Sequence, residues 1–237
     1  MLDIKSTAFL INSITFLLAY FFVVTTTGAF RAWVAEKMGD DTAEQLGFLT
    51  LNPIIHASPI GLVLLILTSF GWGKHVPINP FNFYGKNRYL RMAIAYYSNV
   101  FLHMVLAIIG LCILLWWFGP MVINFVYSAI GRDIFSHASM GQFFTGYSTI
   151  SLVIGFIIVA MVALHIGLAV LDFLLNTCML GLAIFAEDQM SYMQYSLHFT
   201  LFAPLILIWF FYRPMLIVVI KITTYTGVLL AHMIGAF

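Results

Sequence analysis

Two charged side chains, Arg31 and Asp172, lie within or beside long apolar runs of this 237-residue chain. Ionisable groups are costly at membrane depth and often mark a functional site. We expect Arg31 to extend from a helix end to the membrane interface; the alternative is a pair with Asp172 or another carboxylate in a cavity. Asp172 is expected to accept a hydrogen bond from Asn99 or from a neighbouring hydroxyl. A proton or ion relay through Asp172 stays open as a second interpretation.

Several histidines fall in or near the same apolar runs: His103, His165, His198 and His232. Two histidines on facing helices could bind a b-type haem or a metal ion. These four share no fixed spacing within one helix, so each is instead expected to be a polar residue that is satisfied between helices.

The composition identifies the setting in which these residues must work. Hydrophobic residues make up 62% of the chain and charged residues only 8%, whereas soluble domains carry about 25% charged residues. This indicates a polytopic integral membrane protein. The net charge is +1 and the basic residues are scattered, which gives no sign of nucleic-acid binding. Cys112 and Cys178 sit inside apolar runs and are interpreted as small hydrophobic residues.

The apolar runs predict an all-α fold with about six transmembrane helices, since each crossing needs about 20 apolar residues. We treat residues 1–237 as one membrane domain. The predicted helices are 8–28, 54–70, 91–118, 149–185, 197–212 and 214–234. The most polar segment, about 31–53, is predicted to lie at the membrane interface. Residues 71–90 are predicted to form a turn-rich loop, and its cluster of basic residues places it on the cytoplasmic side.

The region 24–83 carries several motifs in a fixed order. It contains G-D-D-T-A at residues 39–43, N-P-I-I-H-A-S-P-I-G at 52–61 and G-W-G-K-H-V-P-I-N-P at 71–80. In these motifs the sequence closely resembles the site-2 protease family of intramembrane zinc metallopeptidases, in its compact bacterial form. That resemblance implies a six-helix membrane core with a cleft that accepts a transmembrane helix.

The chain departs from this family at the positions that would carry its chemistry. The family has an H-E-x-x-H motif where this sequence has Thr27, Gly28 and Arg31 at the histidine, glutamate and histidine positions. The best alignment places Leu180 at the third ligand, an aspartate. Catalytic zinc needs three protein ligands and an open position for water, and a general base must take the proton of that water. The resemblance therefore implies an inactive homologue, with no metal and no cofactor.

The same alignment predicts local structure. The family has prolines that unwind its fourth helix near the aspartate, and this chain lacks them, so residues 168–185 are expected to stay helical around a filled former active site. His56 is a motif residue of the scaffold, and we expect it to hydrogen-bond the interfacial segment.

Three functional hypotheses follow. The first is a pseudoprotease that serves as an accessory, assembly or structural subunit of a larger complex in a bacterial inner membrane. Other integral membrane subunits and lipids would be its partners, in a hetero-oligomer. The second is an active metalloprotease with non-standard ligands, such as His56 with Asp172. The third is an electron-transfer subunit associated with haem or quinone.

Overall fold

The structure is a computed structural model that describes residues 4–68, 70–123, 126, 147–185, 192, 196, 212–233 and 235. This described part is all-α, as the composition predicts. Its helices, in chain order, are α1 (Ile4–Met38), α2 (Thr42–Gln45), α3 (Pro53–His56), α4 (Pro59–Thr68), the 3-10 helix η1 (Pro80–Asn82), α5 (Arg88–Phe118), α8 (Thr149–Phe185) and α10 (Tyr212–Met233). Among the same residues there is no strand, and one isolated antiparallel bridge joins Ala57 to Gly73.

Three segments of the described chain are long and apolar enough to cross a membrane: Ser13–Met38, Arg88–Phe118 and Thr149–Phe185. They are the helices of an integral membrane protein. The predicted helices 91–118 and 149–185 coincide with α5 and α8, and 214–234 corresponds to α10. The predicted helix 197–212 lies, except for its last residue, outside the described residues. The total of six crossings therefore stays a prediction.

The first predicted helix was placed too short. Helix α1 does not end at Gly28 but continues to Met38, so residues 31–38 belong to the same helix. The segment after Gly28 is rich in alanine and other residues that favour helices and contains no proline. The helix ends where Gly39 adopts φ 109°, a left-handed conformation that glycine takes at little cost.

The second predicted helix, 54–70, is wrong as a membrane crossing. It is divided into α3, which Asn52 caps by accepting a hydrogen bond from the Ile54 N–H at 3.1 Å, and α4. Ala57 between them is extended, with ψ 132°, and a proline at position 59 disfavours helix at the residue before it. Helix α4 has ten residues, about 15 Å, or half of the roughly 30 Å hydrocarbon core.

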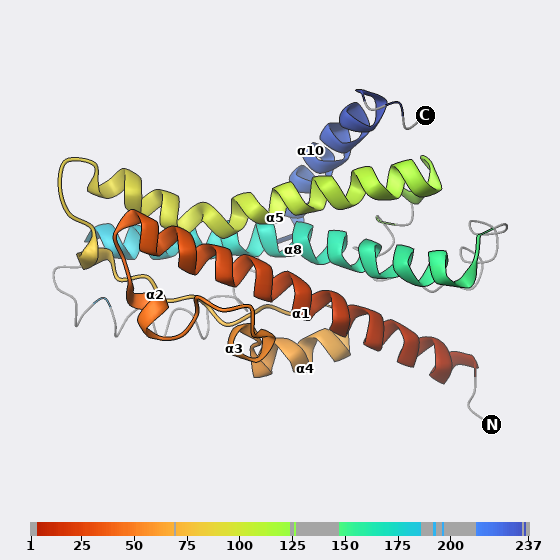
Figure 1. Ribbon diagram of the computed structural model, residues 1–237, viewed down its shortest axis with the longest axis horizontal. Coiled ribbons are helices and arrows are strands. Elements are labelled where there is room, and N and C mark those ends of the chain that lie inside the picture. Colours follow the sequence, from red (N-terminus) through yellow and green to blue (C-terminus); the bar gives the residue numbers. More distant parts are fainter. Residues whose placement is uncertain are drawn as a thin grey trace.

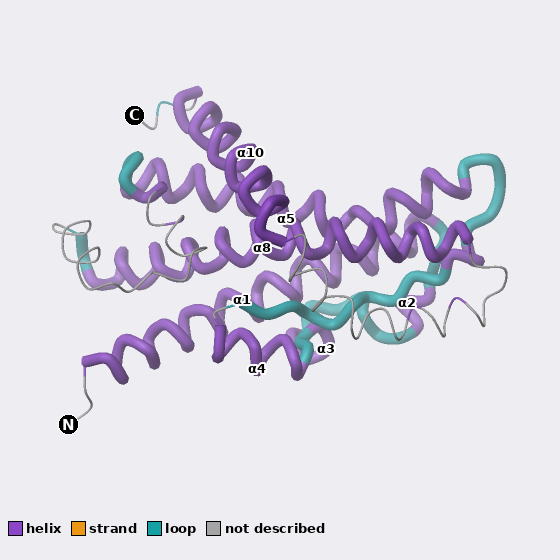
Figure 2. The backbone as a smooth tube through the Cα atoms, turned by 180° about the vertical axis from the view of Figure 1, so that it is seen from behind, coloured by secondary structure: helices purple, strands orange, loops and turns teal. Residues whose placement is uncertain are grey.

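The broken segment is fixed to α1 by one hydroxyl. The Tyr20 hydroxyl donates to the Trp72 carbonyl oxygen at 3.0 Å and accepts from the Ser58 N–H at 3.0 Å. The backbones of α4 and the following loop touch, because a Cβ on Gly61 would lie 1.9 Å from the Trp72 carbonyl oxygen. Residues 70–87 are largely non-helical apart from η1, as predicted, and Figure 2 shows this loop running beside α1 towards the start of α5.

Helices α1, α5 and α8 lie side by side and form the core (Figure 1). The contacts between them are made by buried apolar side chains, among them Phe16, Val23, Leu111, Leu114, Leu164 and Leu171. Helix α8 is one continuous helix of 37 residues. The prediction that residues 168–185 stay helical is therefore confirmed.

Candidate functional site

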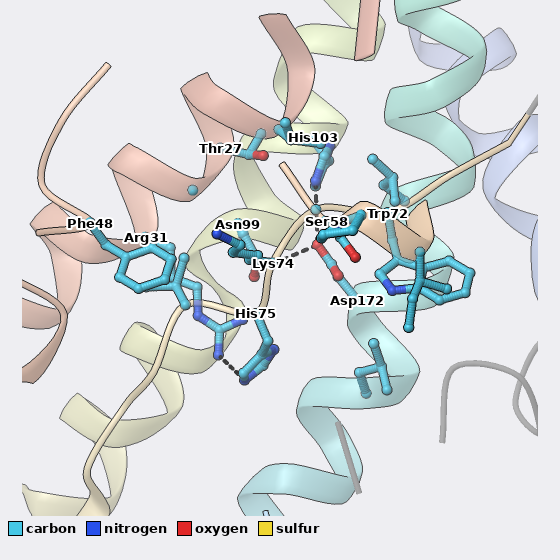
Figure 3. A pocket seen from close by; sticks show the side chains of 18 residues that line it. Thr27, Arg31, Phe48, Ser58, Trp72, Lys74, His75, Asn99, His103 and Asp172 are labelled. Carbon is cyan, nitrogen blue, oxygen red and sulfur yellow. Dashed lines mark hydrogen bonds and ion pairs between the residues drawn. The ribbon is translucent and has the colours of Figure 1, made fainter. Parts of the chain in front are cut away.

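A cavity of about 430 Å³ lies between α1, α5, α8 and the segment from Ser58 to Val76. Figure 3 shows its lining side chains, which come from elements that are distant in sequence. Thr27, Gly28 and Arg31, which the family resemblance places at its metal-binding motif, all line it. The expectation of a filled former active site is wrong, because this space remains although the fourth helix is continuous.

Arg31 is buried inside this site, with 2% of its surface exposed. Its Nη1 donates to Asn176 Oδ1 at 2.9 Å, its Nη2 lies 3.3 Å from His75 Nε2, and its guanidinium lies over the Tyr96 ring at 5.6 Å. The interpretation that Arg31 extends to the interface is wrong, since α1 continues past it and buries it between helices. In the described residues Arg31 forms no ion pair with a carboxylate.

His75 accepts from Arg31 as a neutral imidazole. Burial, and then the positive charge of Arg31, hold the pKa of His75 well below its ordinary value. A guanidinium can only donate hydrogen bonds, so Nε2 of His75 must be the unprotonated nitrogen. The site therefore fixes the tautomer of His75.

A chain of hydrogen bonds continues from Arg31 across the helices. Asn176 Nδ2 donates to Asn99 Oδ1 at 3.0 Å, and Asn99 Nδ2 donates to Asp172 Oδ2 at 2.6 Å. Asp172 Oδ2 also lies 3.3 Å from Nε2 of His103. The predicted hydrogen bond from Asn99 to Asp172 is thus present. Figure 3 shows Arg31 and His75 on one side of the cavity, His103 and Asp172 on the other, and Asn99 between them.

Among the described residues, the carboxylate that lines the cavity is Asp172, whereas Leu180 is not part of its lining. Leu180 packs against a separate apolar cluster with Met92 and Met179. It lies eight residues beyond Asp172 on a continuous helix, about 12 Å along the axis. Without an unwound segment, no residue at position 180 can face the same space as Thr27.

The imidazole of His56 packs directly against the backbone of Gly28. A Cβ on Gly28 would lie 2.3 Å from Nδ1 of His56, whose Nε2 is 2.8 Å from the Thr50 carbonyl oxygen. The predicted contact of His56 with the interfacial segment is therefore present. Burial lowers the pKa of His56, the Thr50 bond acts to raise it, and the Lys74 charge lowers it. The glutamate of the family motif does not fit at position 28 unless this imidazole moves.

The two histidines on facing helices contact each other directly. His103 Nδ1 lies 2.8 Å from His165 Nδ1. Metal–imidazole bonds are about 2 Å long, so opposite ligands of one metal lie about 4 Å apart. This arrangement leaves no room for an iron between them. His232 is exposed in the last turn of α10, and His198 lies outside the described residues.

The residues at the cavity do not fit a catalytic zinc ion. Threonine and glycine supply no zinc ligand there and arginine is a cation, and no group of three His, Cys, Asp or Glu side chains in the described part of the chain could hold a metal. A dication about 5 Å from the Arg31 guanidinium would be repelled by roughly 7 kcal/mol at an effective dielectric constant of about 20.

The sequence analysis missed Asn176 and gave His75 no role. The sequence does contain a pattern that could have identified Asn176. Asp172 and Asn176 are four residues apart on α8, and Asn99 and His103 are four residues apart on α5. Residues four apart lie on one helix face. Two facing polar pairs within apolar helices predict a shared polar contact.

A curated protein of Bacillus subtilis (strain 168), named "Putative zinc metalloprotease YwhC", is similar to this chain. The two are 34% identical over 126 residues, which is 52% of this chain and 52% of the relative. The chain thus spans about half the length of the curated relative it matches. No family model matches the chain, and no solved structure matches it. The similarity supports a relationship between about half of this membrane protein and the site-2-protease-like family that its motifs resemble.

Proposed function

We propose that this protein is a non-catalytic relative of the site-2 proteases that acts by binding. In this role it is an accessory, assembly or structural subunit of a larger membrane protein complex, in a bacterial inner membrane. The former substrate cleft holds a partner helix or a lipid, and the partners are other integral membrane subunits.

One observation carries the proposal. The family resemblance places Arg31 at the second zinc-binding histidine, and Asn176 and His75 hold its buried guanidinium at the cavity. A fixed positive charge there opposes a dication, while the cavity itself is retained. This combination favours a protein that has lost the zinc site and still has a cavity able to bind a ligand.

The enzyme alternative receives no support from the geometry. His56 is not among the residues that line the cavity, and its Nδ1 packs against Gly28. Asp172 lines the cavity, where Asn99 and His103 contact it. The two residues therefore do not meet in one space as a pair of metal ligands.

The test is gentle detergent extraction of the tagged chain at its natural expression level, followed by native mass spectrometry and zinc analysis. We expect one heteromeric species with identified membrane subunits in fixed ratio, and zinc far below one ion per chain. A free monomer as the main species, or one zinc per chain together with cleavage of a transmembrane substrate, would contradict the proposal. The double variant Thr27→His, Arg31→His serves as the control that zinc loading is detectable.

A further inference from the structure

We propose that the cavity binds the anionic head group of an amphiphilic lipid, a carboxylate or a phosphate, against Arg31. This inference rests on the proposed binding function and names the ligand class of the same cavity. At the place where the family resemblance puts a zinc ion, this cavity has the positively charged side chain of Arg31.

The charge of Arg31 lacks a direct counter-ion among the described residues. The groups that contact it, Asn176, neutral His75 and the ring of Tyr96, carry no negative charge. Its Nε is buried and has no hydrogen-bond partner in the described structure. A buried donor on a charged group is costly when unpaired. Arg31 lines the cavity, so it offers an uncompensated charge and an unpaired donor to an anion that displaces the groups now covering it.

The other charged groups at the cavity are arranged to admit one anion. Lys74 lines the cavity and is exposed, which places a second positive charge at its solvent side. The carboxylate of Asp172 is bound by Asn99 and by His103 on the opposite side from Arg31. With Arg31, Lys74 and Asp172 ionised, the lining carries a net charge of +1, which a monoanion neutralises.

The rest of the lining favours a lipid over a free inorganic anion. Apolar side chains of Val24, Ile60, Leu168 and Leu175, with the indole of Trp72, share the cavity with these charges. Its volume of about 430 Å³ falls within the usual ligand range of about 300–1,000 Å³.

The experiment measures quenching of Trp72 in the purified full chain by dibrominated stearate and dibrominated phosphatidate. The dibrominated alcohol and diacylglycerol are the neutral probes, and Trp72→Phe identifies the signal from the cavity. We expect saturable binding of both anions and at least tenfold weaker binding of the neutral probes. Inorganic phosphate in excess should not displace the stearate, because it lacks an apolar tail.

Arg31→Met should weaken binding of the anions roughly ten- to hundredfold, the range expected for a charge-assisted hydrogen bond. Lys86→Met, which removes an exposed positive charge from the same loop, should leave binding unchanged. Lys74→Met, at the exposed edge, should weaken binding without a risk to folding, and it keeps the test decisive if the Arg31 variant does not fold.

Equal affinity for charged and neutral probes, equal behaviour of the Arg31 and Lys86 variants, or displacement by inorganic phosphate would overturn this inference. Occupation of the cavity by a partner helix, with no lipid binding, would also overturn it. These outcomes are separate from the proposed function, since recovery of the heteromeric complex would be unaffected by them.

Discussion

The contact between Gly28 and His56 allows a quantitative test of the site's architecture. Gly28→Ala adds a Cβ only 2.3 Å from the imidazole, and the ring carbon Cγ is at 3.1 Å, so the whole ring must move. His56 is 1% exposed and lies edge-on against Phe48. Overpacking of this kind costs about 1–3 kcal/mol, and loss of the bond to Thr50 costs about 1 kcal/mol more.

A more favourable helix propensity offsets part of this loss. Alanine in a helix interior is about 1 kcal/mol better than glycine, which leaves a net destabilisation of about 2 kcal/mol. For a chain of this size that corresponds to a fall of about 4–8 °C in the unfolding temperature. Gly181→Ala is the matched control, because it adds the same methyl group to a helix with no atom within 4 Å, and it should raise the unfolding temperature by about 2–4 °C.

The assay is thermal unfolding in a mild detergent, followed by tryptophan fluorescence. In the background His56→Ala the ring is absent, so the Gly28→Ala substitution should lose most of its cost, which a double-mutant cycle measures. If Gly28→Ala stabilises the protein as much as Gly181→Ala, the packing described for His56 is incorrect.

Three further predictions concern the same region. Thr27→His with Arg31→His should create a site for one zinc ion per chain, measured by elemental analysis, and adding Asp172→Asn should abolish it; zinc retained in the triple variant would disprove the role of Asp172. Because the pKa of His75 is lowered in the folded protein, the unfolded state takes up its proton first, near pH 6.5. The unfolding temperature should therefore be steady above that pH and fall below it, and His75→Gln should flatten the fall. Gly61→Ala should destabilise the protein more than any other alanine substitution named here, since its Cβ meets backbone at 1.9 Å; an unchanged unfolding temperature would refute this close approach.

The sequence predicted the elements that depend on local pattern. Helices α5 and α8 follow from long apolar runs, and α5 ends at Phe118, before Gly119 and the proline at position 120, as the sequence predicts. The hydrogen bond between Asn99 and Asp172 was predicted because few polar groups were available on the facing helices. These features need only composition, periodicity and the cost of burying a polar group.

The surroundings of Arg31 could not be predicted in the same way. Its partner Asn176 lies 145 residues away, and no local pattern links the two. The end of α1 was misplaced because Gly28 was taken as a boundary, whereas in the structure it is the residue that allows His56 to approach. A single sequence does not distinguish a glycine that makes room for a neighbouring side chain, such as Gly28, from a glycine that ends a helix, such as Gly39.

The Tyr20 hydroxyl has a consequence for access to the cavity. It hydrogen-bonds to the turn before α4, through the Ser58 N–H, and also to the loop after α4, through the Trp72 carbonyl oxygen. Moving either segment alone away from α1 leaves a backbone group without the hydrogen bond that this hydroxyl supplies, at a cost of about 1 kcal/mol. Opening the cavity on this side therefore favours movement of both segments together, and Tyr20→Phe should lower the free energy of that opening.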